Sequence, residues 1–121
     1  MRDFRELKVW EKAHGVTLDV YKMTRTFPKD ELYGLTSQTR RAATSVGANI
    51  AEGCGKDSRP DFARYLQTAP GSASELEYHL LPARDLGLLE ESTHKGLTER
   101  VSEIKRMLTG FIKYLHREAA A

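Results

Sequence analysis

Small or apolar side chains recur at alternating steps of four and three residues in four segments of this 121-residue chain. The segments span residues 9–27, 35–53, 62–87 and 97–115. A repeat of about 3.5 residues is typical of helices that pack side by side at a shallow angle. No segment of comparable length alternates with the period of two that a half-buried strand requires. The pattern therefore predicts four helices and no sheet.

Proline and glycine separate these four segments. Pro28 disfavours helical geometry at the residue before it, and Gly53, Gly55 and Gly87 can adopt the left-handed conformation that ends many helices. The connections are short, which favours antiparallel neighbours. We therefore expect residues 1–121 to form one domain, an all-α, antiparallel up-down four-helix bundle. Its helices are expected at about residues 5–26, 33–53, 59–87 and 93–117.

The third segment contains Pro70-Gly71 followed by Ser72-Ala73-Ser74-Glu75, which matches a helix start signal. Two readings are open here. The first is a pair of helices at 60–68 and 73–86, and the second is one long helix kinked near Pro70. The apolar repeat runs through Pro70 without a change of phase, so we favour the kinked helix.

The first two predicted helices have more apolar surface than one bundle core requires. The first helix carries a second stripe beside its core stripe, and the second helix is rich in Ala, Gly and Ser between Ala42 and Ala51. The second stripe consists of Leu7, Trp10, His14, Thr17, Tyr21 and Thr24. Burial against another copy of the chain would account for both features, so we expect a homo-oligomer.

Charge is unevenly distributed along the chain, although the formal net charge is only +2. Residues 60–91 carry six acidic and two basic side chains, whereas residues 92–121 carry six basic and three acidic ones. Such segregation favours an anionic partner such as RNA or DNA. The candidate nucleic-acid contacts are Lys8, Lys12, Lys22, Arg40, Arg41, Lys105, Arg106, Lys113 and Arg117.

Side chains that could support catalysis or bind a metal are scattered. The four histidines stand far apart in the sequence, and Cys54 has no catalytic context. We therefore expect no enzymatic activity, no metal and no cofactor. A single cysteine fits a reducing cytoplasm, and no apolar run is long enough to cross a membrane. We expect a cytoplasmic protein.

The second helix also carries a group of polar side chains close to its apolar stripe. The group consists of Gln38, Ser45, Asn49 and Glu52. They are either ordinary exposed residues or a buried hydrogen-bonded network that fixes how the helices align. On the second reading Asn49 and Glu52 are buried, and Arg40 or Arg41 compensates a carboxylate.

Several motifs spread along the chain carry a resemblance to a known family. They are Phe4, Leu7, Trp10, Ala13, Tyr21, Phe27-Pro28, Glu31, Gly34-Leu35, Gln38, Arg40-Arg41, Ser45, Asn49-Ile50-Ala51-Glu52-Gly53, Gly71-Ser72, Glu75-Leu76-Glu77 and Asp85-Leu86-Gly87. The chain resembles the small bacterial four-helix bundle proteins encoded by intervening sequences of 23S ribosomal RNA genes. That family includes the accessory variability determinant of diversity-generating retroelements. The Asn-Ile-Ala-Glu-Gly stretch is the most specific match, and Pro70 is the departure from the family pattern.

The resemblance implies a homopentameric ring and, in the retroelement members, association with nucleic acid beside a reverse transcriptase. It implies no enzymatic activity. Two functions follow as hypotheses: a sequence-tolerant nucleic-acid-binding adapter that acts with RNA or a reverse transcriptase, which we favour, and a protein-protein scaffold with no nucleic-acid role. The chain lacks the interleaved aromatic and basic residues that stack single strands, so specific recognition of bases is not expected.

Overall fold

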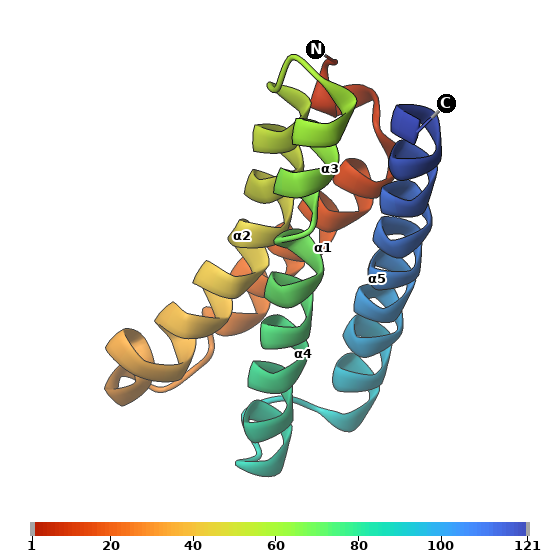
Figure 1. Ribbon diagram of the computed structural model, residues 1–121. Helices are drawn as coiled ribbons and strands as arrows, with labels where there is room; N and C mark the ends of the chain where they lie inside the picture. Colours follow the sequence, from red (N-terminus) through yellow and green to blue (C-terminus); the bar gives the residue numbers. More distant parts are fainter. Residues whose placement is uncertain (1, 121) are drawn as a thin grey trace.

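The computed structural model describes residues 2–120, with side chains described as far as Glu118. The main helices are α1 (Lys8–Thr24), α2 (Ser37–Cys54), α3 (Arg59–Leu66), α4 (Ala69–Asp85) and α5 (Glu91–Ala120). Figure 1 shows that α3 and α4 follow one another along one edge, so the molecule has four columns. The described residues contain no strand. The predicted all-α class is confirmed.

The four columns pack as a closed bundle. α1 packs against α2 and α5, and α4 also packs against α2 and α5. The short α3 extends the α4 column and contacts the same two helices. The start of the chain, the turn between α2 and α3, and the end of α5 all lie at one end of the bundle (Figure 1). The predicted four-helix bundle is therefore confirmed.

The core consists of the side chains that the apolar repeat selects. Val20, Ile50, Leu66, Leu80 and Leu108 come from the four columns, and none of them exposes measurable surface. Alanines fill the narrower spaces between helices, and Ala42, Ala63 and Ala83 are equally buried. Burying one large aliphatic side chain contributes about 1.5–3 kcal/mol, so these contacts dominate the stability of the fold.

Helix bounds differ from the predicted ones at the first two helices. Residues Phe4–Glu6 form a separate 3-10 turn, and Leu7 adopts an extended conformation before α1 begins. A 3-10 turn (Lys29–Glu31) and a π-helical turn (Leu32–Thr36) precede α2. Gly34 departs from helical geometry there, and the Glu31 carboxylate accepts a hydrogen bond of 3.0 Å from the Leu35 amide. This side-chain bond replaces a helical one, which explains why the regular helix begins four residues later than predicted.

The single kinked helix predicted across Pro70 is wrong, because α3 ends at Leu66 and α4 begins at Ala69. The two-helix alternative also misplaced the second start at residue 73. Pro70 lies in the first turn of α4, where its missing N–H is tolerated. Gln67 and Thr68 keep right-handed dihedral angles, so the direction of the column barely changes. The apolar repeat therefore keeps its phase across a real break.

Two glycine predictions had opposite outcomes. Gly87 adopts the predicted left-handed conformation, with φ of 76°. Its amide donates to the Arg84 carbonyl, and the Leu88 amide donates to the Ala83 carbonyl. These two bonds form the Schellman motif that ends α4. The left-handed ending predicted at Gly53–Gly55 is wrong. Gly55 keeps φ of −79°, and its amide donates to the Glu52 carbonyl at 3.1 Å. Gly53 lies inside α2 and serves close packing instead.

Candidate nucleic-acid interface

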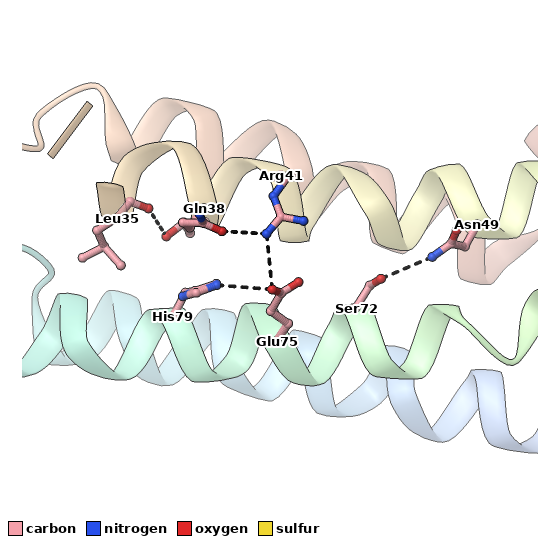
Figure 2. Close-up of polar contacts among 8 residues, drawn as sticks. Leu35, Gln38, Arg41, Asn49, Ser72, Glu75 and His79 are labelled. Atoms are coloured by element: carbon pink, nitrogen blue, oxygen red, sulfur yellow. Dashed lines mark hydrogen bonds and ion pairs between the residues drawn. The ribbon is translucent and has the colours of Figure 1, made fainter. Parts of the chain in front are cut away.

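A polar cluster joins α2 to α4, and Figure 2 shows its members. Arg41 donates a hydrogen bond of 2.6 Å to the Gln38 side-chain oxygen and lies 3.5 Å from the Glu75 carboxylate. The Nε2 atom of His79 lies 3.7 Å from the same carboxylate and has no hydrogen-bond partner among the described residues. Arg41, which we predicted as a nucleic-acid contact, is therefore engaged in holding two helices together.

A second contact between α2 and α4 lies nearer the other end of α2. The Asn49 side-chain amide donates a 3.2 Å hydrogen bond to the Ser72 hydroxyl (Figure 2). Asn49 and Ser45 are half-buried, as expected for residues beside the core stripe. The burial predicted for Glu52 is wrong in the single chain, because Glu52 is exposed. Gln38 is exposed as well. Residues 38 and 52 are two heptads apart, so they lie on the same side of α2, and that side faces solvent.

Arg40 joins α2 to α1. Its Nε donates a 2.7 Å hydrogen bond to the hydroxyl of the buried Thr24, and its guanidinium lies 4.8 Å from the centroid of the Tyr21 ring. A guanidinium stacked on an aromatic ring and bonded to a buried hydroxyl is held by the fold. Both arginines predicted as contacts on α2 therefore bond to neighbouring side chains, and Arg40 is the more fully engaged of the two.

Two further predicted contacts form ion pairs between helices. Lys12 lies 3.2 Å from Glu103, which joins α1 to α5, and Lys105 lies 3.1 Å from Glu77, which joins α5 to α4. A third pair, Arg100 with Asp19, also joins α5 to α1. All three pairs are at least one-third exposed, so each contributes little to stability in water. Through these pairs the Lys12 and Lys105 ammonium groups are bound to carboxylates of neighbouring helices.

The remaining predicted cations lie on the adjacent helices α1 and α5. Lys8 and Lys22 lie on the side of α1 that packs toward α5, on the same stripe as Lys12 and Asp19. Arg106, Lys113 and Arg117 lie on the outward side of α5. Lys95 shares that side, because eleven residues make three helical turns. Sequence reasoning missed Lys95, although its spacing from Arg106 was the available signal.

We call this surface the basic face. It consists of Lys8, Lys22, Lys95, Arg106, Lys113 and Arg117. All six are exposed, and none of them forms an ion pair with another described residue. Two carboxylates of α5 are near the row in sequence, with Glu99 four residues after Lys95 and Glu103 three residues before Arg106. The basic face therefore holds cations whose charge is available to an external anion.

The second stripe of α1 is only partly used by the bundle. Thr24 is buried and Thr17 donates to the Ala43 carbonyl at 3.0 Å, whereas His14 and Tyr21 are exposed. Two clefts of about 580 and 260 Å³ lie over α1 and α2 and meet at Thr44 and Ala48. The smaller cleft has no lysine, arginine or carboxylate in its lining.

Exposed apolar side chains stand beside the larger cleft. Tyr33 is 91% exposed and Leu32 is 47% exposed, and both line that cleft. Together with the small residues of the second cleft they form a continuous surface that we call the α1–α2 face. It consists of the residues that line the two clefts: Trp10, His14, Thr17, Tyr21, Leu32, Tyr33, Thr36, Ser37, Arg40, Arg41, Thr44, Ser45, Gly47, Ala48 and Ala51.

The buried thiol of Cys54 gives a testable prediction. Burial raises the pKa of the Cys54 thiol above its ordinary value, and the nearby Asp3 carboxylate acts in the same direction while the Arg2 guanidinium opposes it. Because the thiolate is the reactive form, we expect Cys54 in the folded protein to react with a disulfide reagent at pH 8 at least about tenfold more slowly than in urea. The rate in the folded protein should keep rising above pH 9. Equal rates in folded and unfolded protein would contradict this account.

The described residues contain no group of three or more His, Cys, Asp or Glu side chains placed to hold a metal ion. None of the helices in the described part of the chain is long and apolar enough to cross a membrane.

Comparison with known proteins assigns the fold to a family. The family model for the 23S rRNA-intervening sequence protein matches residues 5–110. A crystal structure of a protein of unknown function from the S23 ribosomal protein family of Bacteroides thetaiotaomicron VPI-5482 superposes with a TM-score of 0.77 at 27% identity. The match covers 87% of this chain and 98% of that chain. The comparison with curated proteins gave no match. With most of its length matched, the chain belongs to the 23S rRNA-intervening sequence protein family.

Proposed function

We propose that this protein is a non-enzymatic homo-oligomer that binds RNA or DNA through the basic face, without preference for sequence. The observation that carries the proposal is the row of Lys95, Arg106, Lys113 and Arg117 along α5, whose charges no other described residue neutralises. Arginine and lysine on one side of a long helix match the spaced phosphates of a nucleic-acid strand.

The side chains beside this row favour contact with the phosphate backbone over contact with bases. Stacking of bases needs exposed aromatic rings among the cations. The most exposed aromatic residues, Tyr33 and Tyr78, belong to the α1–α2 connection and to α4, and neither lies on α5. Tyr114 is on α5, but the Arg59 guanidinium lies 6.0 Å from its ring centroid. Binding through phosphates alone is expected to tolerate any sequence.

The oligomer is the second part of the proposal. We assign the α1–α2 face to contact with a second copy of the chain, because it combines exposed Leu32 and Tyr33 with the uncharged cleft around Ala48. This contact does not involve α5, so its row of basic residues would stay exposed in the oligomer. Repetition multiplies weak binding, since several sites on one rigid body bind a long anion more tightly than one site. The number five, and a reverse transcriptase as a partner, rest on the family resemblance.

Reversal of charge on α5 tests the proposal. In the double variant Arg106→Glu/Lys113→Glu we expect the affinity for labelled RNA and DNA of unrelated sequence to fall by at least about tenfold at 50 mM salt. Fluorescence anisotropy measures the affinity. Wild-type binding should weaken about 50-fold between 50 and 200 mM salt if four phosphates of a single strand are contacted.

The matched control is Arg25→Glu/Lys29→Glu. Both residues are exposed, form no ion pair with a described residue, and lie in the connection between α1 and α2. This variant changes the net charge equally and should keep most of the affinity. Equal losses in both variants would indicate an effect of net charge only. Absence of binding at the lower salt would favour the protein-protein scaffold.

A further inference from the structure

A cleft of about 240 Å³ opens at the end of the bundle where the chain starts and where α2 turns into α3 (Figure 1). Three cationic residues from different segments line it: Arg2 before α1, Lys56 in the turn, and Arg59 at the start of α3. Asp57 and Ser58 complete its polar part, and the buried Phe62 closes its apolar side. This cleft is distinct from the basic face on α5.

Three contacts restrain the residues that carry these cations. The Arg2 amide donates a 3.1 Å hydrogen bond to the Cys54 carbonyl, which fixes the start of the chain against the end of α2. The Lys56 ammonium lies 4.0 Å from the centroid of the Tyr65 ring. The Arg59 guanidinium lies 3.7 Å from the Glu118 carboxylate, and both side chains of this pair are nearly half exposed. A ring orients the ammonium without neutralising it, and one long ion pair leaves most N–H donors of the guanidinium unused.

The ligand donors of this cleft are side chains rather than the backbone of α3. Pro60 has no N–H, and the Asp61 amide donates to the Ser58 hydroxyl at 3.2 Å. The Phe62 amide donates to the Ser58 carbonyl at 2.9 Å. The Asp61 and Phe62 amides are therefore bonded within the chain, so we attribute anion binding in this cleft to Arg2, Lys56 and Arg59. Substitution of these side chains is consequently a direct test.

We propose that this cleft binds a terminal phosphate group, the phosphate monoester at the end of a nucleic-acid strand. The lining carries Arg2, Lys56 and Arg59 against the single carboxylate of Asp57, a formal charge of +2, which favours an anion of charge near −2. A terminal phosphate carries about −1.5 to −2 at pH 7, whereas each phosphodiester within a strand carries a single charge. Leu115 of α5 also lines the cleft, so Lys113 and Arg117, two residues before and after it, lie near the cleft along that helix. In this respect the inference rests on the proposed function, because a strand lying along α5 would bring its end to the cleft.

The test compares oligonucleotides that differ only at one end. Strands of one sequence with a 5′-phosphate, a 3′-phosphate or two hydroxyl ends are labelled internally and titrated into the full chain at fixed salt. We expect one phosphorylated strand to bind about tenfold more tightly than the hydroxyl strand, the effect of one charge-assisted hydrogen bond. Lys56→Gln and Arg59→Gln should each remove the difference. The control Arg64→Gln, on the same helix and paired with Asp61, should keep it.

The outcomes separate this inference from the proposed function. Equal affinity of all three strands overturns the phosphate site and leaves binding by the basic face intact. A preference that persists in both Lys56→Gln and Arg59→Gln also overturns it. Inorganic phosphate is the second probe, read by amide chemical shifts of residues 56–59 and 61 in the full chain. If phosphate shifts these amides while no oligonucleotide binds, the site stands with a free phosphate as its ligand, and the proposed function fails.

Discussion

Ala48→Arg is expected to convert the oligomer into a folded monomer of about 13.7 kDa. Ala48 is exposed on α2 at the point where the two clefts of the α1–α2 face meet. An arginine there would place a charge in the smaller cleft, whose lining holds no charged residue, in every copy, and a buried charge without a partner commonly costs about 3–5 kcal/mol. Sedimentation velocity at micromolar concentration measures the change in mass, and circular dichroism shows whether the helices persist.

The matched control for this variant is Thr109→Arg. Thr109 is exposed on α5, away from the α1–α2 face, and the substitution adds the same side chain to a helix interior. It should leave the mass of the oligomer unchanged. A wild-type chain that sediments as a monomer would contradict the assignment of the α1–α2 face to a second copy. An Ala48→Arg oligomer of unchanged mass would place the contact elsewhere.

Gly53→Ala is expected to lower the free energy of unfolding by about 1–3 kcal/mol, although alanine is the better helix former. A Cβ atom at residue 53 would lie 3.0 Å from Cδ1 of the Phe62 ring and 3.3 Å from the Phe62 backbone oxygen. The ring can shift, but the backbone oxygen is fixed by α3. α2 and α3 therefore approach so closely at this point that only glycine fits. Urea unfolding measures the change.

A glycine-to-alanine substitution in α5 should instead raise the free energy of unfolding. Gly110 lies in α5, and a Cβ atom there would meet no atom within 4 Å. Gly110→Ala should therefore raise stability by about 0.5–1 kcal/mol, the difference in helix propensity. Combining Gly53→Ala with Phe62→Leu should recover part of the loss, because the smaller side chain relieves the contact with the ring. Equal effects at residues 53 and 110 would contradict the close approach of α2 to α3.

Much of the fold could be predicted because the apolar repeat alone determines which residues form the helices and the core. The apolar repeat depends only on which side of a helix faces the core, and Val20, Ile50, Leu66, Leu80 and Leu108 follow it. The missed bounds depend on single side-chain bonds that periodicity does not encode. The Glu31 carboxylate at the Leu35 amide delays α2. Pro70 opens a new helix without shifting the phase of the repeat.

The candidate site was less predictable, because it depends on how neighbouring helices align. A sequence identifies Arg41 and Lys105 as basic, but it does not indicate that Glu75 and Glu77 lie opposite them. Likewise Glu52 lies close to the apolar stripe of α2 in the sequence, yet its side chain is exposed. Arg106, Lys113 and Arg117 were found because the outward side of a long helix needs no knowledge of its neighbours.

The dependence of binding on salt tests most directly whether the α5 row binds phosphates. Each neutralised phosphate of a single strand changes the slope of log K against log salt concentration by about −0.7. The neutral variant Arg106→Gln/Lys113→Gln removes two cations, so its slope should be shallower than that of the wild type by about 1.4 for each copy that contacts the strand. A variant whose slope equals that of the wild type would contradict the role of α5 in nucleic-acid binding.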